Sequence, residues 1–477
     1  MRRALVVLAA LLVLVLGYAT ADVYDLVPGI LTRAPAPTPT AASSASGTAS
    51  TGSTPTPTPS ADAPLAALDA DAPEPTTAGL TAALAPLVSA PALGPSVGVV
   101  VRDGLTGRLL YSRSATTPRT PASTVKLLSA AAVWTRLSPT ATMATRVVQG
   151  TSPTSIVLVA GGDTLLARGT GSPDAVAGRA GLGDLASQVA GRLRAAGTTS
   201  VSLSLDLGYA PGPRYPPSWR ASDVTAGYTQ GVSMIGLAED RPEPGKPSPR
   251  RPEVEVATAF LADLAAQGVT ARLATTSPYA AHAGVGAMEL GSVSSAPYAD
   301  VLALTLATSD NALMENLARQ AAAAAGRPAT EAGVTAFVRA ALTGLGVDLR
   351  GVVLADACGL GVGTTVTAAA LGQVLALGAS GTDPALRGTL AALPVAGLSG
   401  TLEDRFEGTR TRAVAGIPRA KTGTLTGTSS LAGTTVDADG RLLLFVVLAD
   451  RVPASGTDAA RDALDRLVAG LTGCGCR

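Results

Sequence analysis

The most continuous hydrophobic runs of the chain lie near its two ends and predict strands of one sheet. Residues 96–101 and 109–111 form two short apolar runs separated by an Asp-Gly turn. Near the other end, residues 429–436 and 441–449 flank a second Asp-Gly pair, a pattern typical of a hairpin. The last of these runs is apolar without alternation, which indicates burial on both faces. We therefore expect a sheet closed by strands from both ends of the chain.

Helical spacing of apolar residues appears between these strands and after them. Apolar side chains recur at helical intervals within residues 124–137, and residues 457–471 carry one apolar stripe. A third stretch, 312–325, follows polar residues that favour the start of a helix. Strands at both ends with helices between them favour an α/β sandwich, a sheet with helices on both sides.

The pattern changes between residues 149 and 290, where short runs of Val, Ser and Leu alternate with Pro-rich turns. Such runs favour strands and such turns favour tight connections. We therefore interpret residues 149–290 as an inserted, mainly β domain. The flanking segments, 80–148 and 291–477, then form one discontinuous domain around it.

The N-terminal segment has the features of export. Arg2 and Arg3 precede an apolar run, and the small residues at 19–21 resemble a signal peptidase site. The run also approaches the roughly 20 residues that span a bilayer. Residues 1–21 are thus a signal peptide or an uncleaved membrane anchor, and either places the rest outside the cytoplasm. Residues 22–79, rich in Pro, Thr, Ser and Ala, predict a disordered linker.

Composition excludes several classes of function. The 477 residues hold 36 Lys and Arg against 35 Asp and Glu, a net charge of +1, so no nucleic-acid partner is expected. The single histidine, His282, leaves little for a Ser-His-Asp triad or a multi-histidine metal site. The three cysteines lack zinc spacing, and their pairing stays open. Lysine occurs only at Lys126, Lys246 and Lys421, so lysine chemistry must use one of these positions.

Ser123 and Lys126 lie three residues apart at the expected start of a helix, so their side chains share one face. Free N–H groups and a partial positive charge at a helix N-terminus stabilise an oxyanion. Where histidine is missing, a lysine can activate a serine if its pKa falls by about three units from roughly 10.4. Burial or a second cation supplies such a shift. The alternative is a capping serine beside a solvated lysine.

A second motif, Lys421-Thr422-Gly423-Thr424, lies where the C-terminal hairpin begins. Its cation and hydroxyls suit a substrate carboxylate, and its glycine permits close backbone approach. The Thr424 N–H could then face a substrate carbonyl.

A third motif, Ser309-Asp310-Asn311, precedes the Ala-rich helix. Its hydroxyl could relay a proton and its amide could hold both substrate and Lys126. The alternative for this motif is a helix cap, a role that all three residue types fill well.

The three motifs together, in this order, form the signature of penicillin-binding proteins and class A β-lactamases. The chain resembles D-alanyl-D-alanine carboxypeptidase/endopeptidases of the penicillin-binding protein 4 type, which are low-molecular-mass class C penicillin-binding proteins, in an actinobacterial-like form. The stretches that carry the resemblance are PASTVKLLSAAA around Ser123, SDNALMENLAR around Ser309 and RAKTGTLTGTSSLAG at 419–433. It covers the chain from about Leu80 to the C-terminus. It implies a penicillin-binding/β-lactamase-like serine transpeptidase fold, an antiparallel sheet with helices on both sides and a helical subdomain.

The resemblance also implies roles. Ser123 would be acylated with Lys126 as its base, Ser309 would pass a proton to the leaving amine, and the N–H groups of Ser123 and Thr424 would form the oxyanion hole. The substrate-binding residues would be Asn311, Lys421, Thr422, Gly423 and Thr424. No metal and no cofactor is implied. The substrates would be peptidoglycan stem peptides ending in D-Ala-D-Ala, within the cell envelope, with β-lactams as covalent inhibitors.

One segment departs from the family pattern. Relatives carry Asp-x-Ser-Gly-Leu-Ser, whereas residues 356–361 read Asp-Ala-Cys-Gly-Leu-Gly, so a thiol and a hydrogen replace two hydroxyls.

Two alternatives to a D,D-peptidase follow from the motifs. One is a β-lactamase on the same fold, although residues 326–420 contain no Glu-x-x-x-Asn to supply its catalytic glutamate. The other is a catalytically weak penicillin-binding or wall-binding module.

Overall fold

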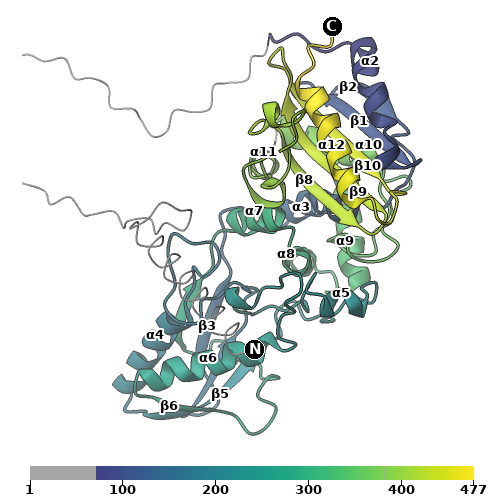
Figure 1. Ribbon diagram of the computed structural model, residues 1–477. Helices are drawn as coiled ribbons and strands as arrows, with labels where there is room; N and C mark the ends of the chain where they lie inside the picture. Colours follow the sequence, from purple (N-terminus) through teal and green to yellow (C-terminus); the bar gives the residue numbers. More distant parts are fainter. Residues whose placement is uncertain (1–70, 382) are drawn as a thin grey trace, which may run out of the picture. The chain divides into compact units, whose positions relative to one another are not determined.

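A five-stranded antiparallel sheet joins the two ends of the chain, as the hydrophobic runs predict. The computed structural model describes residues 71–381 and 383–477 (Figure 1). The sheet order is β2-β1-β10-β9-β8. Its strands are β1 (Val97–Asp103), β2 (Leu109–Arg113), β8 (Arg419–Leu425), β9 (Thr428–Val436) and β10 (Leu442–Ala449). The expected hairpin is β9 and β10, which pair with Leu442 opposite Val436.

The central strand β10 is apolar on both faces because helices cover both sides of the sheet. Phe445 packs on the side of α2 (Thr77–Val88) and α12 (Thr457–Thr472), and Val446 packs on the opposite side. Figure 1 shows α12 lying along one face of this sheet. The α/β architecture with helices on both sides is therefore confirmed.

Helices build the opposite layer and the expected helical subdomain. α3 (Lys126–Trp134) follows a 3-10 turn at Ala122–Val125 and packs against α8 and α9. The other helices here are α7 (Tyr298–Thr308), α8 (Asn311–Ala324), α9 (Glu331–Gly344), α10 (Ala368–Ala379) and α11 (Pro384–Ala391). The helix expected over 124–137 is thus a 3-10 turn followed by a shorter α-helix.

The insert carries a second five-stranded sheet, in the order β6-β5-β4-β3-β7. Its elements are β3 (Ala144–Gln149), β4 (Ser155–Val159), α4 (Leu182–Ala195), β5 (Ser200–Asp206), α5 (Ala221–Thr225), α6 (Pro252–Ala266), β6 (Thr270–Leu273) and β7 (Glu289–Ser294). Because β3 begins at Ala144 and β7 ends at Ser294, this sheet extends beyond the interpreted 149–290 on both sides.

The expectation of a mainly β insert is corrected to a mixed α/β unit. β4, β5 and β6 run parallel, and parallel neighbours need a crossover connection, which α4 and α6 supply. The missed signal was the helical spacing of Leu182, Leu185 and Val189, which are all buried on α4.

The first described residues already contact the folded domain. α2 begins at Thr77, within the interpreted linker 22–79, and Ala72 is buried. The interpreted signal or anchor, 1–21, and the linker up to residue 70 lie outside the described residues. Among the residues that the structure describes, no helix has the length and hydropathy needed to cross a bilayer.

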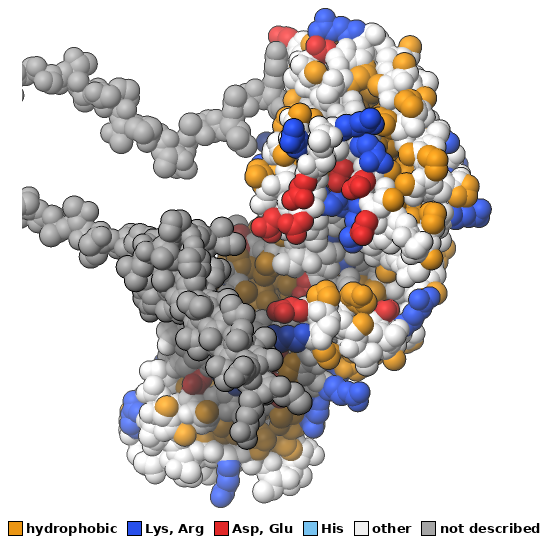
Figure 2. Space-filling model, viewed as in Figure 1, with side chains coloured by type: hydrophobic (Ala, Val, Ile, Leu, Met, Phe, Trp, Pro, Cys, Tyr) orange, Lys and Arg blue, Asp and Glu red, His pale blue; other side chains and the backbone are white. Residues whose placement is uncertain are grey.

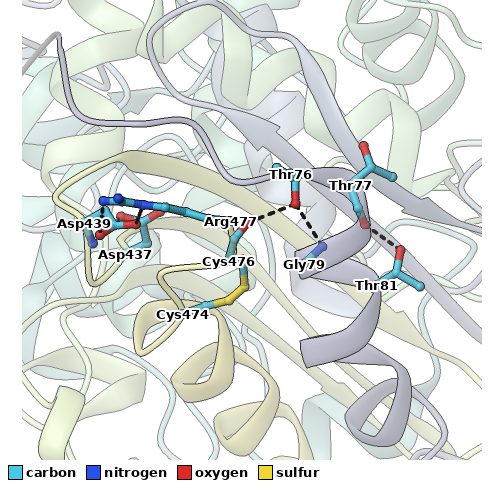
Figure 3. Close-up of a disulfide and its surroundings, with 9 residues drawn as sticks. All are labelled: Thr76, Thr77, Gly79, Thr81, Asp437, Asp439, Cys474, Cys476 and Arg477. Carbon is cyan, nitrogen blue, oxygen red and sulfur yellow. Dashed lines mark hydrogen bonds and ion pairs between the residues drawn. A yellow bond between two sulfur atoms is a disulfide. The ribbon is translucent and has the colours of Figure 1, made fainter.

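The cysteine pairing that the sequence left open is resolved at the C-terminus. Cys474 and Cys476 form a disulfide (Figure 3). The Cys476 carbonyl accepts from the Thr76 N–H at 2.7 Å, and Arg477 donates to Asp439 at 2.9 Å. The C-terminal residues are therefore held against the start of α2.

On the face of the molecule that Figure 2 presents, acidic and basic side chains intermingle.

Candidate active site

The first pair of candidate residues lies at the start of α3. Lys126 is fully buried, and its Nζ donates to the Ser123 Oγ at 2.9 Å. Ser123 is partly exposed, in the 3-10 turn that precedes the helix. Ala122 before it has a φ of 48°, a left-handed conformation that is uncommon for a residue with a Cβ. The solvated-lysine alternative is thereby excluded, since this lysine has no contact with solvent.

Three oxygen atoms surround the Lys126 amine. Besides the Ser123 hydroxyl, the Asn311 Oδ1 accepts at 2.6 Å and the Cys358 carbonyl accepts at 2.8 Å. Burial lowers the pKa of Lys126, and nearby acidic groups partly oppose this. Cys358 belongs to residues 356–361, which we call the Asp356 turn. The segment that departs from the family pattern therefore contributes a backbone carbonyl to the site. A change of side chain at Cys358 does not remove this carbonyl.

The Ser309 motif divides its roles among its residues. Asp310 caps α8 by accepting from the Leu313 N–H at 2.8 Å, so the capping alternative applies to the aspartate. Ser309, between α7 and α8, adopts a left-handed conformation with φ of 58°. The Asn311 Nδ2 donates to the Tyr228 carbonyl of the insert at 2.8 Å. The amide of Asn311 therefore joins Lys126 to the insert.

The third motif lies on β8, an edge strand of the sheet. The Lys421 Nζ donates to the Ser309 Oγ at 2.8 Å and to the Thr422 carbonyl at 2.9 Å. Lys421 is fully buried, and burial together with the nearby Lys126 charge holds its pKa well below the usual lysine range. Its hydrogen-bond partners are all uncharged, so a substrate carboxylate would find no competing anion among them.

Gly423 permits β8 to approach the serine turn. A Cβ at this position would lie 2.6 Å from the Pro121 carbonyl oxygen and 3.1 Å from the Ser123 nitrogen. Such distances require a residue without a side chain. Thr424 follows on β8, paired with Ser429 of β9. The structure thus brings all eight candidate residues from the three motifs to one place.

Sequence reasoning missed three contributors to this site. Thr401, in the 3-10 turn Gly400–Leu402 before β8, accepts from the Thr422 hydroxyl at 2.8 Å. The carbonyls of Cys358 and Tyr228 are the others, and a backbone carbonyl leaves no mark on residue type. The remaining lysine, Lys246, is exposed beside Glu243 and takes no part.

One buried group could in principle hold a metal. Within the described residues, Glu315, Asp356 and Cys358 place one potential ligand atom each within 4.8 Å of the others. These atoms already have partners, because Ala357 N–H donates to Glu315 at 2.6 Å and the Cys358 Sγ donates to Asp356 at 3.1 Å. The group is therefore a hydrogen-bonded network of the protein itself.

Two buried lysines each donate a hydrogen bond to a serine hydroxyl, Lys126 to Ser123 and Lys421 to Ser309. This arrangement suits acyl transfer without histidine. Comparison with protein families matches residues 80–245 and 243–471 to the D-Ala-D-Ala carboxypeptidase 3 (S13) family. The chain belongs to this family. It is therefore a peptidase, a D-Ala-D-Ala carboxypeptidase with the fold of penicillin-binding protein 4.

Individual relatives agree with this assignment. Carboxypeptidase DacB of Mycolicibacterium smegmatis is 36% identical over 419 residues, which cover 87% of this chain and 88% of the relative. The crystal structure of penicillin binding protein 4 (dacB) from Haemophilus influenzae superposes with a TM-score of 0.64 at 18% identity, covering 82% of this chain and 98% of that one. A second structure of that protein, complexed with a β-lactam, has a TM-score of 0.57 at 20% identity and the same coverage. The two structures support the fold alone.

Proposed function

We propose that this S13 carboxypeptidase acts through an acyl-enzyme on Ser123, with Lys126 as the base. The observation that carries the proposal is the 2.9 Å hydrogen bond between the Lys126 Nζ and the Ser123 Oγ, in a site that excludes solvent from the lysine. The family membership supports a peptide ending in D-Ala-D-Ala as the substrate.

In the proposed reaction, the Ser123 oxygen attacks the carbonyl of the penultimate D-Ala and its proton passes to Lys126. The N–H groups of Ser123 and Thr424 receive the oxyanion. The C–N bond then breaks as the proton held by Lys126 passes through the Ser309 hydroxyl to the departing D-Ala nitrogen, which leaves Lys126 neutral. Lys126 next takes a proton from the attacking water, the water oxygen displaces Ser123 from the ester, and the proton returns to the Ser123 oxygen. Both serines needed for proton transfer are hydrogen-bonded to a lysine.

We assign recognition of the terminal carboxylate to Lys421 together with the hydroxyls of Thr422 and Thr424. A fixed cation and two hydroxyls suit an anion that must be held in one orientation. In the structure the Thr422 hydroxyl donates to the Thr401 hydroxyl at 2.8 Å, so it would exchange this hydrogen bond for one to the substrate carboxylate. Asn311 would hold the substrate backbone while it orients Lys126.

β-Lactams should acylate the same serine, since their ring carbonyl and carboxylate imitate the D-Ala-D-Ala end. The complex of the Haemophilus influenzae protein with a β-lactam supports this extension. We also propose cleavage of D,D-cross-links between stem peptides, because the chemistry at the carbonyl is the same whether free D-Ala or a longer amine leaves.

We place the enzyme outside the cytoplasm, on the basis of the apolar segment and small residues within 1–21. N-terminal sequencing of the protein from its native host separates a cleaved signal from a retained anchor. Recovery of the full-length chain in the cytosolic fraction would contradict this placement.

The function is tested by labelled penicillin and by D-Ala release from a stem pentapeptide, with wild type and Ser123→Ala. The control is Ser138→Ala, an exposed serine just beyond α3. We expect wild type and the control to be labelled and to release D-Ala, and Ser123→Ala to do neither. Labelling of Ser123→Ala at the wild-type rate would falsify the nucleophile assignment.

The same assay separates the rival functions. Rapid release of hydrolysed penicillin with little D-Ala would identify a β-lactamase. A stable adduct without any D-Ala release would identify a weak penicillin-binding module. The proposed carboxypeptidase predicts slow adduct release together with D-Ala release.

A further inference from the structure

The Asp356 turn is organised by one buried carboxylate. Asp356 is 1% exposed, and its oxygens accept from the N–H groups of Gly359 at 2.8 Å, Leu360 at 3.1 Å and Gly361 at 2.6 Å. The Cys358 Sγ donates to it as well, at 3.1 Å. A carboxylate that accepts several successive N–H groups fixes the backbone that carries them.

This turn is held between two helices. On the side of α3, the Lys126 Nζ donates to the Cys358 carbonyl at 2.8 Å and the Ser129 Oγ donates to the Ala357 carbonyl at 2.7 Å. On the side of α8, Glu315 accepts from the Ala357 N–H at 2.6 Å. The Cys358 carbonyl therefore cannot leave the lysine unless several buried hydrogen bonds break.

The Cys358 carbonyl matters because of how a neutral amine distributes its hydrogen bonds. Neutral Lys126 has two N–H groups and one lone pair for three oxygen neighbours. The Asn311 oxygen and the Cys358 carbonyl can only accept, so they occupy both N–H groups. The lone pair is then left for the Ser123 hydroxyl, which is the orientation that a base requires. Without the carbonyl, one N–H would be free to rotate toward Ser123.

The insert reaches the same turn. The Trp219 indole, 8% exposed, donates to the Asp356 Oδ2 at 3.0 Å. The neighbouring Ser218 carbonyl accepts from the Val362 N–H at 3.0 Å. A Cβ on Gly361 would overlap the Ser218 hydroxyl, so the glycine that replaces the family's serine leaves the room that Ser218 fills. This segment of the insert closes the turn from outside.

We propose that Asp356 is a positioning residue for Lys126, acting through the Asp356 turn, and that Trp219 extends this support into the insert. The proposal rests on the proposed role of Lys126 as the base of Ser123. It gives the altered segment 356–361 a function that depends on its backbone and its aspartate, and it does not require the two missing hydroxyls.

The pH dependence of acylation reports on this role. The titratable groups near Lys126 are Asp356 and Cys358 of the turn, Asp310 and Glu315 of α8, and Lys421 of β8. The charge of Asp356 favours the protonated amine, and so does the carbonyl acceptor that Asp356 holds in place. Asp356→Asn removes the negative charge and loosens the Cys358 carbonyl. The acid limb of the pH–rate profile should then move to lower pH while the plateau falls.

The experiment measures the second-order rate constant of acylation by labelled penicillin from pH 5 to pH 9, with the full-length enzyme. The variants are Asp356→Asn and Trp219→Phe. The first control is Asp437→Asn, a buried carboxylate that accepts N–H groups of a different turn. The second is Trp134→Phe, whose indole donates to the Thr389 hydroxyl at 2.8 Å outside the site.

We expect Asp356→Asn to lower the plateau at least tenfold and Trp219→Phe to lower it three- to tenfold, both with the acid limb moved to lower pH. Both controls should stay within twofold of wild type. A lower plateau with an unmoved acid limb would indicate a purely structural role and overturn the proposal, as would a wild-type profile. If Asp356→Asn does not fold, the profile of Trp219→Phe decides by the same criteria.

Failure of this inference is distinguishable from failure of the proposed function. If Ser123→Ala is still labelled, Ser123 is not the nucleophile, and the role of Lys126 as its base fails with it. If Ser123→Ala is unlabelled and Asp356→Asn keeps the wild-type profile, the function stands and only the role of Asp356 is wrong.

Discussion

The two buried lysines of the site differ in the charges that surround them. Acidic groups, including Asp356 and Asp310, partly restore the pKa of Lys126, whereas Lys421 has Lys126 itself as its charged neighbour. In the free enzyme, Lys421 therefore holds a proton less readily than Lys126 does. A substrate carboxylate would favour a proton on Lys421, and that charge would in turn favour a neutral Lys126. In the proposed reaction, substrate binding thus prepares the base.

Glu315 makes a prediction about stability. Burial, followed by the charge of Asp356, raises its pKa to about 8. Between the unfolded pKa of roughly 4.3 and this value, the folded state binds one more proton than the unfolded state, so its contribution to stability falls as pH rises. Glu315→Gln keeps an acceptor for the Ala357 N–H and removes this titration.

We expect the free energy of unfolding of Glu315→Gln, relative to wild type, to rise with pH by up to about 1.4 kcal/mol per unit between pH 5.5 and 7.5. Urea denaturation at three pH values measures this difference. Asp163, whose pKa is raised to about 7 by burial, titrates in both proteins and cancels. The exposed Glu403→Gln should show no such trend. A pH-independent difference for Glu315→Gln would show that Glu315 is ionised in the folded state.

At the scale of elements, the site depends on how closely the Asp356 turn approaches the serine turn. Gly359 has a φ of 84°, and a Cβ there would overlap the Ala122 carbonyl oxygen. Gly245 in the insert has nearly the same φ, 83°, but open space around its Cβ position. Alanine at Gly245 would therefore introduce backbone strain alone, whereas alanine at Gly359 would introduce the same strain and a steric overlap.

We expect Gly245→Ala to cost about 1 kcal/mol, the strain of a left-handed residue. Gly359→Ala should cost at least about 2 kcal/mol more, because the serine turn must move, and should also slow penicillin acylation at least tenfold. Thermal unfolding and labelling of both variants measure these effects. Equal losses of stability in the two variants, with normal acylation, would mean that the two turns do not constrain one another.

The parts of the site that the sequence predicted are those carried by side chains within a regular element. Ser123 and Lys126 are three residues apart on one helical face, and Lys421 to Thr424 lie on one strand, so spacing alone relates them. The Cys358 carbonyl comes from an irregular turn more than 200 residues away, and nothing in residue type marks it. The helices of the insert were missed because Pro-rich loops dominated the pattern around them.

At the scale of the whole described molecule, the insert is part of the site. Trp219, Tyr228 and Arg241 of the insert form hydrogen bonds with the sequence motifs or with the Asp356 turn. All three lie in the segment between β5 and α6, which has little regular structure. The insert therefore supplies a loop segment that reaches the start of α8 and the Asp356 turn.

Arg241 allows a test of this coupling. Its guanidinium forms an ion pair with Asp310, with its Nε 2.8 Å from the Oδ2, and both side chains are largely buried. Arg241→Ala would leave the carboxylate between Ser309 and Asn311 without its cation. Removing one partner of a buried pair costs about 3 to 5 kcal/mol, and partial exposure here reduces the expected loss to about 2 to 3 kcal/mol.

The matched control is Arg168→Ala, which breaks an exposed ion pair with Glu239 inside the insert and should cost at most about 1 kcal/mol. We expect Arg241→Ala alone to slow penicillin acylation, at least fivefold, since Ser309 and Asn311 flank the unpaired carboxylate. Thermal unfolding and labelling of both variants measure the two effects. If Arg241→Ala loses stability but acylates normally, the ion pair merely attaches the insert, and the motif keeps its geometry through the Asp310 cap and the Lys421 hydrogen bond.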